Sequence, residues 1–172
     1  MPPDRGTDVN ATAAALLGLL RDGPMTGGQL VAAAAARFGS FFTVTRSQVY
    51  RELPVLAEAG LLKLGEQGPR ASQQFVITAA GRRAFSAWLA VEGGVDGLRS
   101  PLVLRLLHAG VLDPKERSKL VSGAREVYAA RLAQARATAR GATDPYGKAV
   151  ADFTVAYMRA MVKLLDSVPT DD

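Results

Sequence analysis

Side chains that bind phosphates and base edges are concentrated in one short stretch near the middle of the sequence. The stretch is TRSQVYRELPVLAEAG, residues 45–60, and it carries guanidinium, hydroxyl, amide and phenol groups on Arg46, Ser47, Gln48, Tyr50 and Arg51. These groups donate hydrogen bonds to phosphate oxygens and to the base edges exposed in a groove of DNA. If the stretch is helical, Ser47, Tyr50 and Arg51 share one side of the helix with Pro54. These residues predict a nucleic-acid contact.

The other side of the same stretch has the pattern of a helix that packs on a core. Thr45 and Gln48 form a T-x-x-Q capping box, which predicts a helix beginning at Arg46. Three apolar residues follow at i, i+4 and i+7, namely Val49, Leu53 and Leu56. Pro54 removes one backbone hydrogen bond and predicts a kink after residues 46–53. Taken alone, the stretch also fits an ordinary amphipathic helix with a mixed outer face.

The segments on either side of this helix supply the elements that would position it. Thr26 and Gln29 form a second capping box, which predicts a short helix from Gly27 to about Phe38, ending at Gly39. After residue 60, the runs 61–64 and 73–78 are rich in β-prone residues, and the segment between them contains glycine and proline. We therefore expect two helices followed by a β-hairpin, the order of a winged helix-turn-helix.

The tip of the expected hairpin is a second candidate contact with DNA. It contains Arg70 and Ser72, one cation and one hydroxyl, where a wing would lie along the minor groove or the phosphate backbone. Thr78 is placed to cap a following helix, which carries Trp88 and ends at Gly93 and Gly94. We interpret Trp88 as a core or domain-junction residue, because a lone tryptophan at helical spacing is more often core than ligand pocket.

These residues resemble the PadR family of bacterial transcriptional regulators. The matching strings are ALLGLL at 15–20, DGPMTG at 22–27, VYREL at 49–53, GLL at 60–62, FVITAAGR at 75–82 and WL at 88–89. The carboxy-terminal half is similar to the helical tail of the subgroup with the larger dimerisation domain, through LRSPL at 98–102. The resemblance implies a winged helix-turn-helix transcriptional regulator and favours a repressor.

Composition and charge are consistent with a globular DNA-binding protein. The sequence has 172 residues, 48% of them hydrophobic, and a formal net charge of +5. Residues 37–83 hold seven Lys or Arg against three Glu, although a basic surface can also serve solubility alone. There is no cysteine, which excludes disulfides and cysteine-metal sites. The longest apolar run, 13–20, is shorter than the roughly 20 residues of a membrane span, so we expect a cytoplasmic protein.

Glycine-rich breaks and prolines at helix starts predict the domain organisation. Residues 1–9 look like a flexible arm, residues 10–92 form the expected winged helix-turn-helix domain, and residues 98–168 form an all-α domain. In the all-α part, Ser100, Asp113 and Asp144 each precede a proline, which predicts three helix starts. The middle helix is expected over 115–140 and the last over 145–167. The predicted fold is mainly α with a small β-hairpin wing.

Narrow apolar stripes on the two long helices predict a homodimer. The residues assigned to dimerisation are Val121, Tyr128, Leu132, Phe153, Tyr157, Met161 and Leu164, at intervals of three and four within each helix. Dimers are expected because operators are usually read by two symmetric heads. The alternative is that the two helices pack on each other within one chain.

No catalytic constellation is evident, and we expect a protein that is not an enzyme and needs neither metal nor cofactor. The one histidine, His108, lies among Leu106, Leu107 and Val111 without an acidic or nucleophilic partner at a recognisable spacing. The expected partners are double-stranded DNA, a second copy of the chain and an unidentified small-molecule effector, with no membrane. The alternative function is a winged-helix module that binds another protein without sequence-specific DNA binding.

Overall fold

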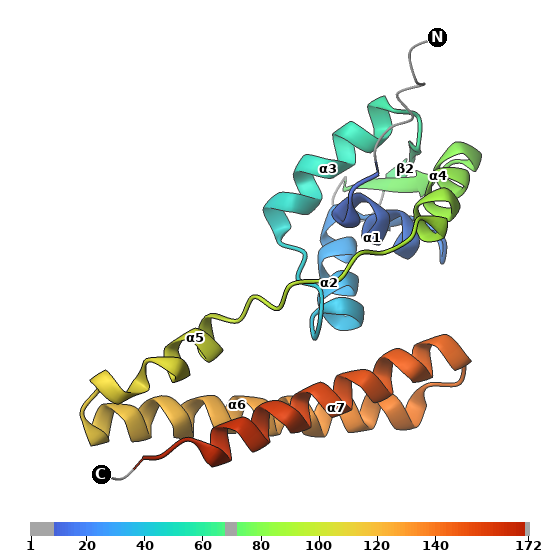
Figure 1. The fold of residues 1–172 in the computed structure, drawn as a ribbon. Coiled ribbons are helices and arrows are strands. Elements are labelled where there is room, and N and C mark those ends of the chain that lie inside the picture. Colours follow the sequence, from blue (N-terminus) through green and yellow to red (C-terminus); the bar gives the residue numbers. More distant parts are fainter. Residues whose placement is uncertain (1–8, 68–71, 171–172) are drawn as a thin grey trace. The chain divides into compact units, whose positions relative to one another are not determined.

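The computed structural model describes residues 9–67 and 72–170. These residues fall into two compact units, the first ending at Gly94 and the second beginning at Val95 (Figure 1). The first unit contains α1 Ala11–Leu20, β1 Met25–Thr26, α2 Gly27–Phe38, α3 Arg46–Glu58, β2 Leu62–Gln67, β3 Gln73–Ile77 and α4 Ala79–Ala90. The second contains α5 Pro101–Leu107, the 3-10 turn η2 Ala109–Val111, α6 Pro114–Gly141 and α7 Pro145–Ser167. The predicted fold class, mainly α with a small β-hairpin wing, is confirmed.

Helix α1 is the centre of the first unit. Its sequence, ATAAALLGLL, contains no charged residue, and a helix that is apolar on all sides is stable only when it is surrounded. Its leucines 16, 17, 19 and 20 are all essentially inaccessible to solvent. Helices α2, α3 and α4 and strand β3 all pack against it. One helix therefore supplies the common core onto which the others dock.

Helices α2 and α3 begin where the two capping boxes predict. In the first box the Thr26 amide donates to Gln29 Oε1 over 2.8 Å, and in the second the Thr45 amide donates to Gln48 Oε1 over 2.8 Å. Each threonine hydroxyl in turn accepts from the glutamine backbone amide over 3.3 Å. These bonds satisfy backbone donors that a helix start leaves open. Both predicted starts, Gly27 and Arg46, are confirmed.

The apolar side of α3 is buried as predicted. Val49, Leu53 and Leu56 are all in the core of the first unit, at 3% exposure or less. Pro54 lies on the exposed side, and the helix continues through it to Glu58. The predicted kink at Pro54 stays a prediction.

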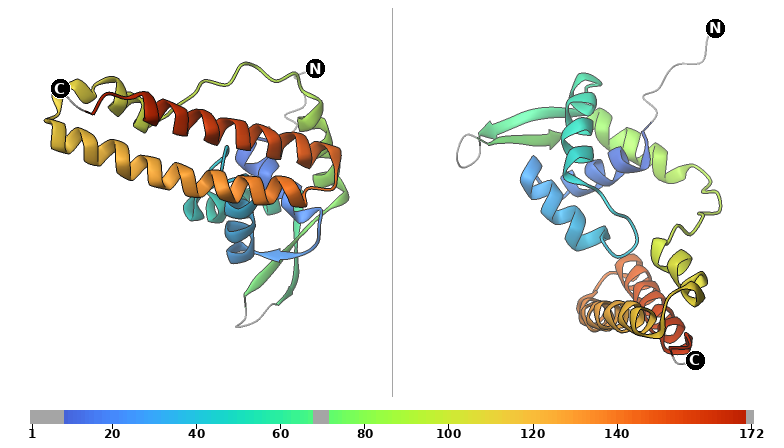
Figure 2. Two further views of the ribbon diagram at one scale, coloured as in Figure 1. Left: turned by 90° about the horizontal axis from the view of Figure 1, so that it is seen from below. Right: turned by 90° about the vertical axis from the view of Figure 1, so that its left-hand side faces the viewer.

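The sheet contains one strand more than the sequence predicts. Strands β2 and β3 form the expected hairpin, with Leu62 opposite Ile77, and they extend away from the helices of the unit (Figure 2). The additional strand β1 pairs with β3, giving the order β1-β3-β2. A strand of two residues offers no alternation from which it could be predicted. It ties the start of α2 to the hairpin.

Helix α4 begins at the predicted cap but contributes less to the core than expected. The Thr78 hydroxyl accepts from the Gly81 amide over 3.0 Å and donates to the Gly60 carbonyl over 2.7 Å. The helix ends at Ala90 instead of at Gly93 and Gly94. Its last turn is exposed, and Trp88 is 37% exposed and outside the core cluster. The prediction of Trp88 as a core residue is wrong, because among the described residues of the first unit no core residue covers the last turn of this helix, and its alternative placement at the domain junction stays a prediction.

The second unit is an antiparallel pair of long helices preceded by the short α5 (Figures 1 and 2). The three predicted caps are present, since Ser100, Asp113 and Asp144 each accept a hydrogen bond from a backbone amide three residues on. Helices α6 and α7 pack along their length. The chain thus supplies its own helix pair, which was the alternative to a seam made by a partner.

No helix in the described part of the chain combines the length and apolar character needed to cross a membrane.

Candidate nucleic-acid interface

The exposed side of α3 displays four of the residues that the sequence assigns to DNA. Arg46, Ser47, Tyr50 and Arg51 are all exposed, whereas Val49 and Leu53 on the other side of the helix are buried. The helix is held from behind by α1, α2 and β2, so its outer face is fixed in direction. Two guanidinium groups and a phenol therefore lie on one exposed helix face.

Arg46 lies over the ring of Tyr50. The guanidinium carbon is 5.2 Å from the ring centroid, within the range of a cation–π contact. In the described part of the chain, no carboxylate lies within ion-pair distance of Arg46. Its charge is free to meet an anion.

Arg51 makes only a long contact with an acidic neighbour, and its guanidinium remains largely exposed. Its Nη2 lies 3.7 Å from Glu52 Oε1, and the Arg51 side chain remains 69% exposed. A contact of that length between an exposed guanidinium and a carboxylate contributes little to stability. Arg51 can therefore turn toward an external ligand at small cost.

Glu52 is a residue that the sequence reasoning missed. It is 8% exposed, and its Oε2 accepts a hydrogen bond from Asn10 Nδ2 over 3.3 Å. Asn10 also caps α1 through its Oδ1, which accepts from the Ala13 amide over 2.9 Å. One side chain thus joins the start of α1 to the middle of α3. The available signal was its spacing, since Glu52 lies three residues after Val49 and four before Leu56, on the side of the apolar stripe.

Two of the assigned residues take part in the α3 cap. Gln48 is half-buried, and its Oε1 accepts from Thr45, which leaves the amide Nε2 as the group that could reach DNA. The Ser47 hydroxyl lies 3.2 Å from the Thr45 hydroxyl. The cap therefore restrains both side chains at the start of the helix.

Of the two wing residues assigned to DNA, the structure describes Ser72. Arg70 lies outside the described residues, and Ser72 is half-buried directly before β3. On β2, Lys63 and Glu66 are both exposed. The hairpin itself is held by its strand pairing and by Gln73 Nε2, which donates to the Gly65 carbonyl over 3.0 Å.

The residues assigned to dimerisation divide into two groups within the second unit. Val121, Leu132 and Met161 are buried within the chain, and Leu132 belongs to the cluster that joins α6 to α7. Tyr128, Tyr157 and Leu164 are half-buried, and Phe153 is 58% exposed. The buried stripe of α7 is Ala151, Thr154, Met158, Met161 and Leu165, so most of the assigned α7 residues lie beside it.

An aromatic cluster spans the exposed edge of this helix pair. The Phe153 and Tyr157 rings are nearly parallel, with centroids 6.4 Å apart. Burial raises the pKa of the Tyr157 hydroxyl, and the neighbouring Tyr128 raises it further. Arg131 lies over the Tyr128 ring. The Phe153 side of the cluster remains open to solvent.

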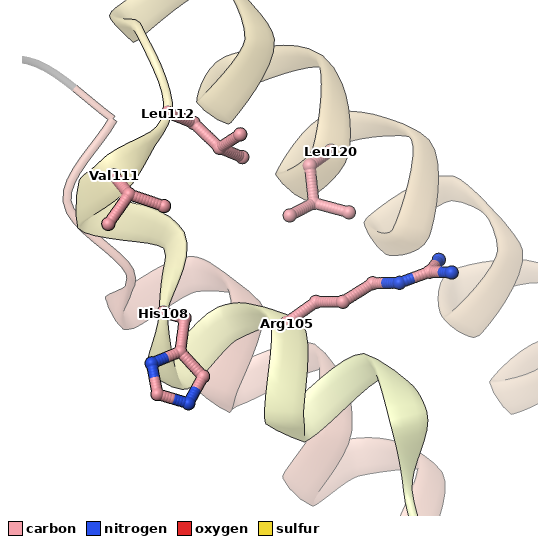
Figure 3. A pocket seen from close by; sticks show the side chains of 5 residues that line it. All are labelled: Arg105, His108, Val111, Leu112 and Leu120. Carbon is pink, nitrogen blue, oxygen red and sulfur yellow. The ribbon is translucent and has the colours of Figure 1, made fainter.

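A pocket of about 370 Å³ lies in the second unit between the α5–η2 segment and α6 (Figure 3). It is lined by Arg105, His108, Val111, Leu112 and Leu120. Figure 3 shows the Arg105 side chain running along the edge toward α6 and the His108 ring turned away from Leu120. The lining between them is almost wholly aliphatic.

The sequence of this interface matches a known protein family. The family model described as "Transcriptional regulator PadR-like family" matches residues 16–87, which include α2, α3 and the hairpin. No curated protein matches the chain with significance.

Three solved structures extend the similarity to the second unit. A PadR-like transcriptional regulator from Bacillus cereus, BC1756, is 22% identical with a TM-score of 0.77, over 90% of this chain and 93% of that chain. Bacillus subtilis PadR in complex with operator DNA is 20% identical with a TM-score of 0.73, over 90% and 94%. The same protein in complex with p-coumaric acid is 21% identical with a TM-score of 0.67, over 90% and 94%. At these identities the similarity concerns the fold. Residues 16–87, which hold the winged helix, match the PadR-like transcriptional regulator family, and the second unit is similar in fold to the same solved structures.

Proposed function

We propose that this protein is a dimeric transcriptional repressor that binds a palindromic promoter site through α3 and the β2–β3 wing. The observation that carries the proposal is the exposed face of α3, where Arg46, Tyr50 and Arg51 lie together on a helix fixed by the core behind it. A rigid helix that displays donors of this kind fits the major groove. The wing would then lie on the adjacent backbone, with Arg70 and Ser72 near phosphate.

The solved complex of Bacillus subtilis PadR with operator DNA supports this use of the fold. Its chain is covered almost completely by the present one, so no large element of that fold is missing here. The proposed DNA contacts of this chain are Arg46, Ser47, Gln48, Tyr50, Arg51, Arg70 and Ser72.

The proposed dimer rests on apolar surface that one chain leaves uncovered. Phe153 and Val150 on α7 and Val127 on α6 are all exposed, although they belong to helices whose other faces are packed. Burial of large apolar side chains contributes about 1.5–3 kcal/mol each, more than exposed ion pairs such as Lys148 with Asp152. We therefore place the partner contact on the Phe153 side. Val121 and Leu132, which are buried within one chain, then support it only indirectly.

The proposal includes a small-molecule effector whose binding changes the affinity of the protein for DNA. Bacillus subtilis PadR has been solved with p-coumaric acid, and this chain has an aliphatic pocket edged by Arg105 and His108. Such a pocket favours an apolar compound. Thermal-shift screening of aromatic acids and aliphatic compounds against the full chain tests this part separately from DNA binding.

The decisive experiment is selection of bound duplexes from a random DNA pool by the full-length protein, followed by affinity measurement at several salt concentrations. The expected result is one enriched inverted repeat, with log affinity falling linearly with log salt by about 0.9 per phosphate contact. Absence of enrichment together with salt-independent binding would contradict the proposal. Capture of a protein partner by the same α3 face would then favour the protein-interaction module.

A further inference from the structure

Gly27, the first residue of α2, lies directly beneath the ring of Tyr50. A Cβ atom placed on Gly27 would be 2.9 Å from both Cε1 and Cζ of Tyr50 and 3.1 Å from its hydroxyl oxygen. Gly27 is buried, and these three Tyr50 atoms are the ones that an added Cβ would meet first. Only a residue without a side chain leaves room for the ring in this position.

The Tyr50 ring thus packs against Gly27 on one side and contacts the Arg46 guanidinium through its face. It is 47% exposed, and Arg46 lies 5.2 Å from its centroid. In the part of the chain that the structure describes, its hydroxyl has no hydrogen-bond partner, so the contacts of the ring itself hold it in place. The position of the ring therefore depends on the space at Gly27, and the position of Arg46 depends on the ring.

We infer that Gly27 is a positioning residue for DNA recognition: it seats Tyr50, and Tyr50 holds the Arg46 guanidinium ready for the nucleic acid. The inference rests on the proposed function and goes beyond it, since Gly27 has no side chain with which to contact DNA. An arginine that is already ordered loses less conformational entropy on binding. The stack of Gly27, Tyr50 and Arg46 joins α2 to the exposed face of α3.

The test is Gly27→Ala in the full chain, with Gly28→Ala as the matched control. Gly28 is exposed, and the nearest atom to a Cβ there is the Thr26 hydroxyl at 4.0 Å. The added methyl at 27 meets only the tip of a flexible side chain, and alanine is a better helix former than glycine. Neither variant should unfold at a lower temperature. Gly27→Ala should weaken binding to the duplex selected by the wild type about five- to tenfold, whereas Gly28→Ala should match the wild type.

Two further measurements separate positioning from other roles. In a Tyr50→Ala background, Gly27→Ala should weaken DNA binding no further, because the ring that it displaces is absent. In the free protein, the Arg46 side-chain protons should move downfield in Gly27→Ala by NMR, because they leave the shielding region above the Tyr50 ring. The second readout needs no DNA.

The outcomes separate failure of the inference from failure of the proposed function. A wild type that selects no duplex removes the proposed function and the inference with it. A wild type that binds, with Gly27→Ala binding equally well or its Arg46 resonances unchanged, overturns the inference alone. A loss that persists in the Tyr50→Ala background overturns it as well, because the start of α2 would then contact the DNA directly.

Discussion

At the scale of single residues, the proposed interface depends on which cations are free. Arg46 is held by an aromatic ring and Arg51 by a long contact to Glu52, so each keeps its charge available. Arg37 differs, because it is paired with Asp22, and Arg125 with Asp166. Arginines that count equally toward the net charge therefore differ in whether their guanidinium is available to bind a phosphate.

Arg51→Ala is expected to weaken binding to the selected duplex by about 1–3 kcal/mol and to relax preference at one base pair, if Arg51 reads a guanine. The matched control is Arg83→Ala, which removes the same charge from the exposed side of α4. Electrophoretic mobility shifts with the selected duplex and with single-base variants provide the measurement. Equal behaviour of both variants would show that α3 does not read bases through Arg51.

At the scale of elements, the first unit is held by a few points where two backbones come close or one side chain bridges two helices. The clearest close approach is at Gly81, where a Cβ would overlap the Leu61 carbonyl oxygen and lie 2.9 Å from an Ile77 side-chain carbon. The clearest bridge is Asn10, which caps α1 and reaches Glu52 on α3.

Gly81→Ala should destabilise the winged-helix unit by about 1–3 kcal/mol, because the methyl group meets backbone that cannot move without disturbing α4 and the hairpin. Chemical unfolding followed by circular dichroism measures the change. Gly28→Ala serves again as control and should alter the free energy of unfolding by less than about 0.5 kcal/mol. Wild-type stability in Gly81→Ala would contradict the close packing of α4 on the backbone at residue 61.

Asn10→Ala should destabilise the same unit by about 0.5–2 kcal/mol, since it removes the α1 cap and leaves a buried carboxylate oxygen without its partner. Asn10→Ser keeps a capping hydroxyl but is too short to span the distance to Glu52. The difference between the two variants in unfolding free energy isolates the capping contribution. If serine and alanine are equally destabilising, the Glu52 bond accounts for the effect.

At the scale of the whole molecule, the second unit raises the question of what its helices pack against. Within one chain α6 and α7 already satisfy each other through Leu132, Ala135 and Met158. What they leave open is the side with Phe153. The dimer proposal is therefore a statement about this second surface.

Phe153→Glu is expected to yield a folded monomer, because Phe153 is exposed within its own chain and a charge there opposes only a partner contact. Sedimentation velocity at micromolar concentration gives the oligomeric state, and circular dichroism gives the helix content. Affinity for the full palindrome should fall far more than affinity for a half-site, since only the palindrome uses two linked heads. Gln134→Glu, at an exposed polar position on α6, should remain dimeric.

A contrasting change tests the packing inside the chain. Met158 is 1% exposed between the helices, so Met158→Glu should lower the helix content of the second unit itself. If Phe153→Glu were instead the variant that unfolds, or if the wild type sedimented as a monomer, the Phe153 surface would have a role other than dimerisation.

The sequence by itself determined the local structure of this protein. Helix starts at Gly27, Arg46, Pro101 and Pro145 were predicted because capping side chains and prolines act over three or four residues, and the buried side of α3 because Val49, Leu53 and Leu56 have the helical period. The hairpin and the fold class followed from the order of these elements.

Only the tertiary structure decided what each face packs against. The sequence could not show that Trp88 is left exposed, that Glu52 is buried beside Asn10, or that β1 joins the sheet. Each depends on residues far apart in the chain. The stripe on α7 is the clearest case, because residues 150–165 include apolar side chains on two adjacent sides. Periodicity predicts that an apolar face exists, but the helix packed against it decides which side is buried. Here α6 covers Met158 and leaves Phe153 exposed.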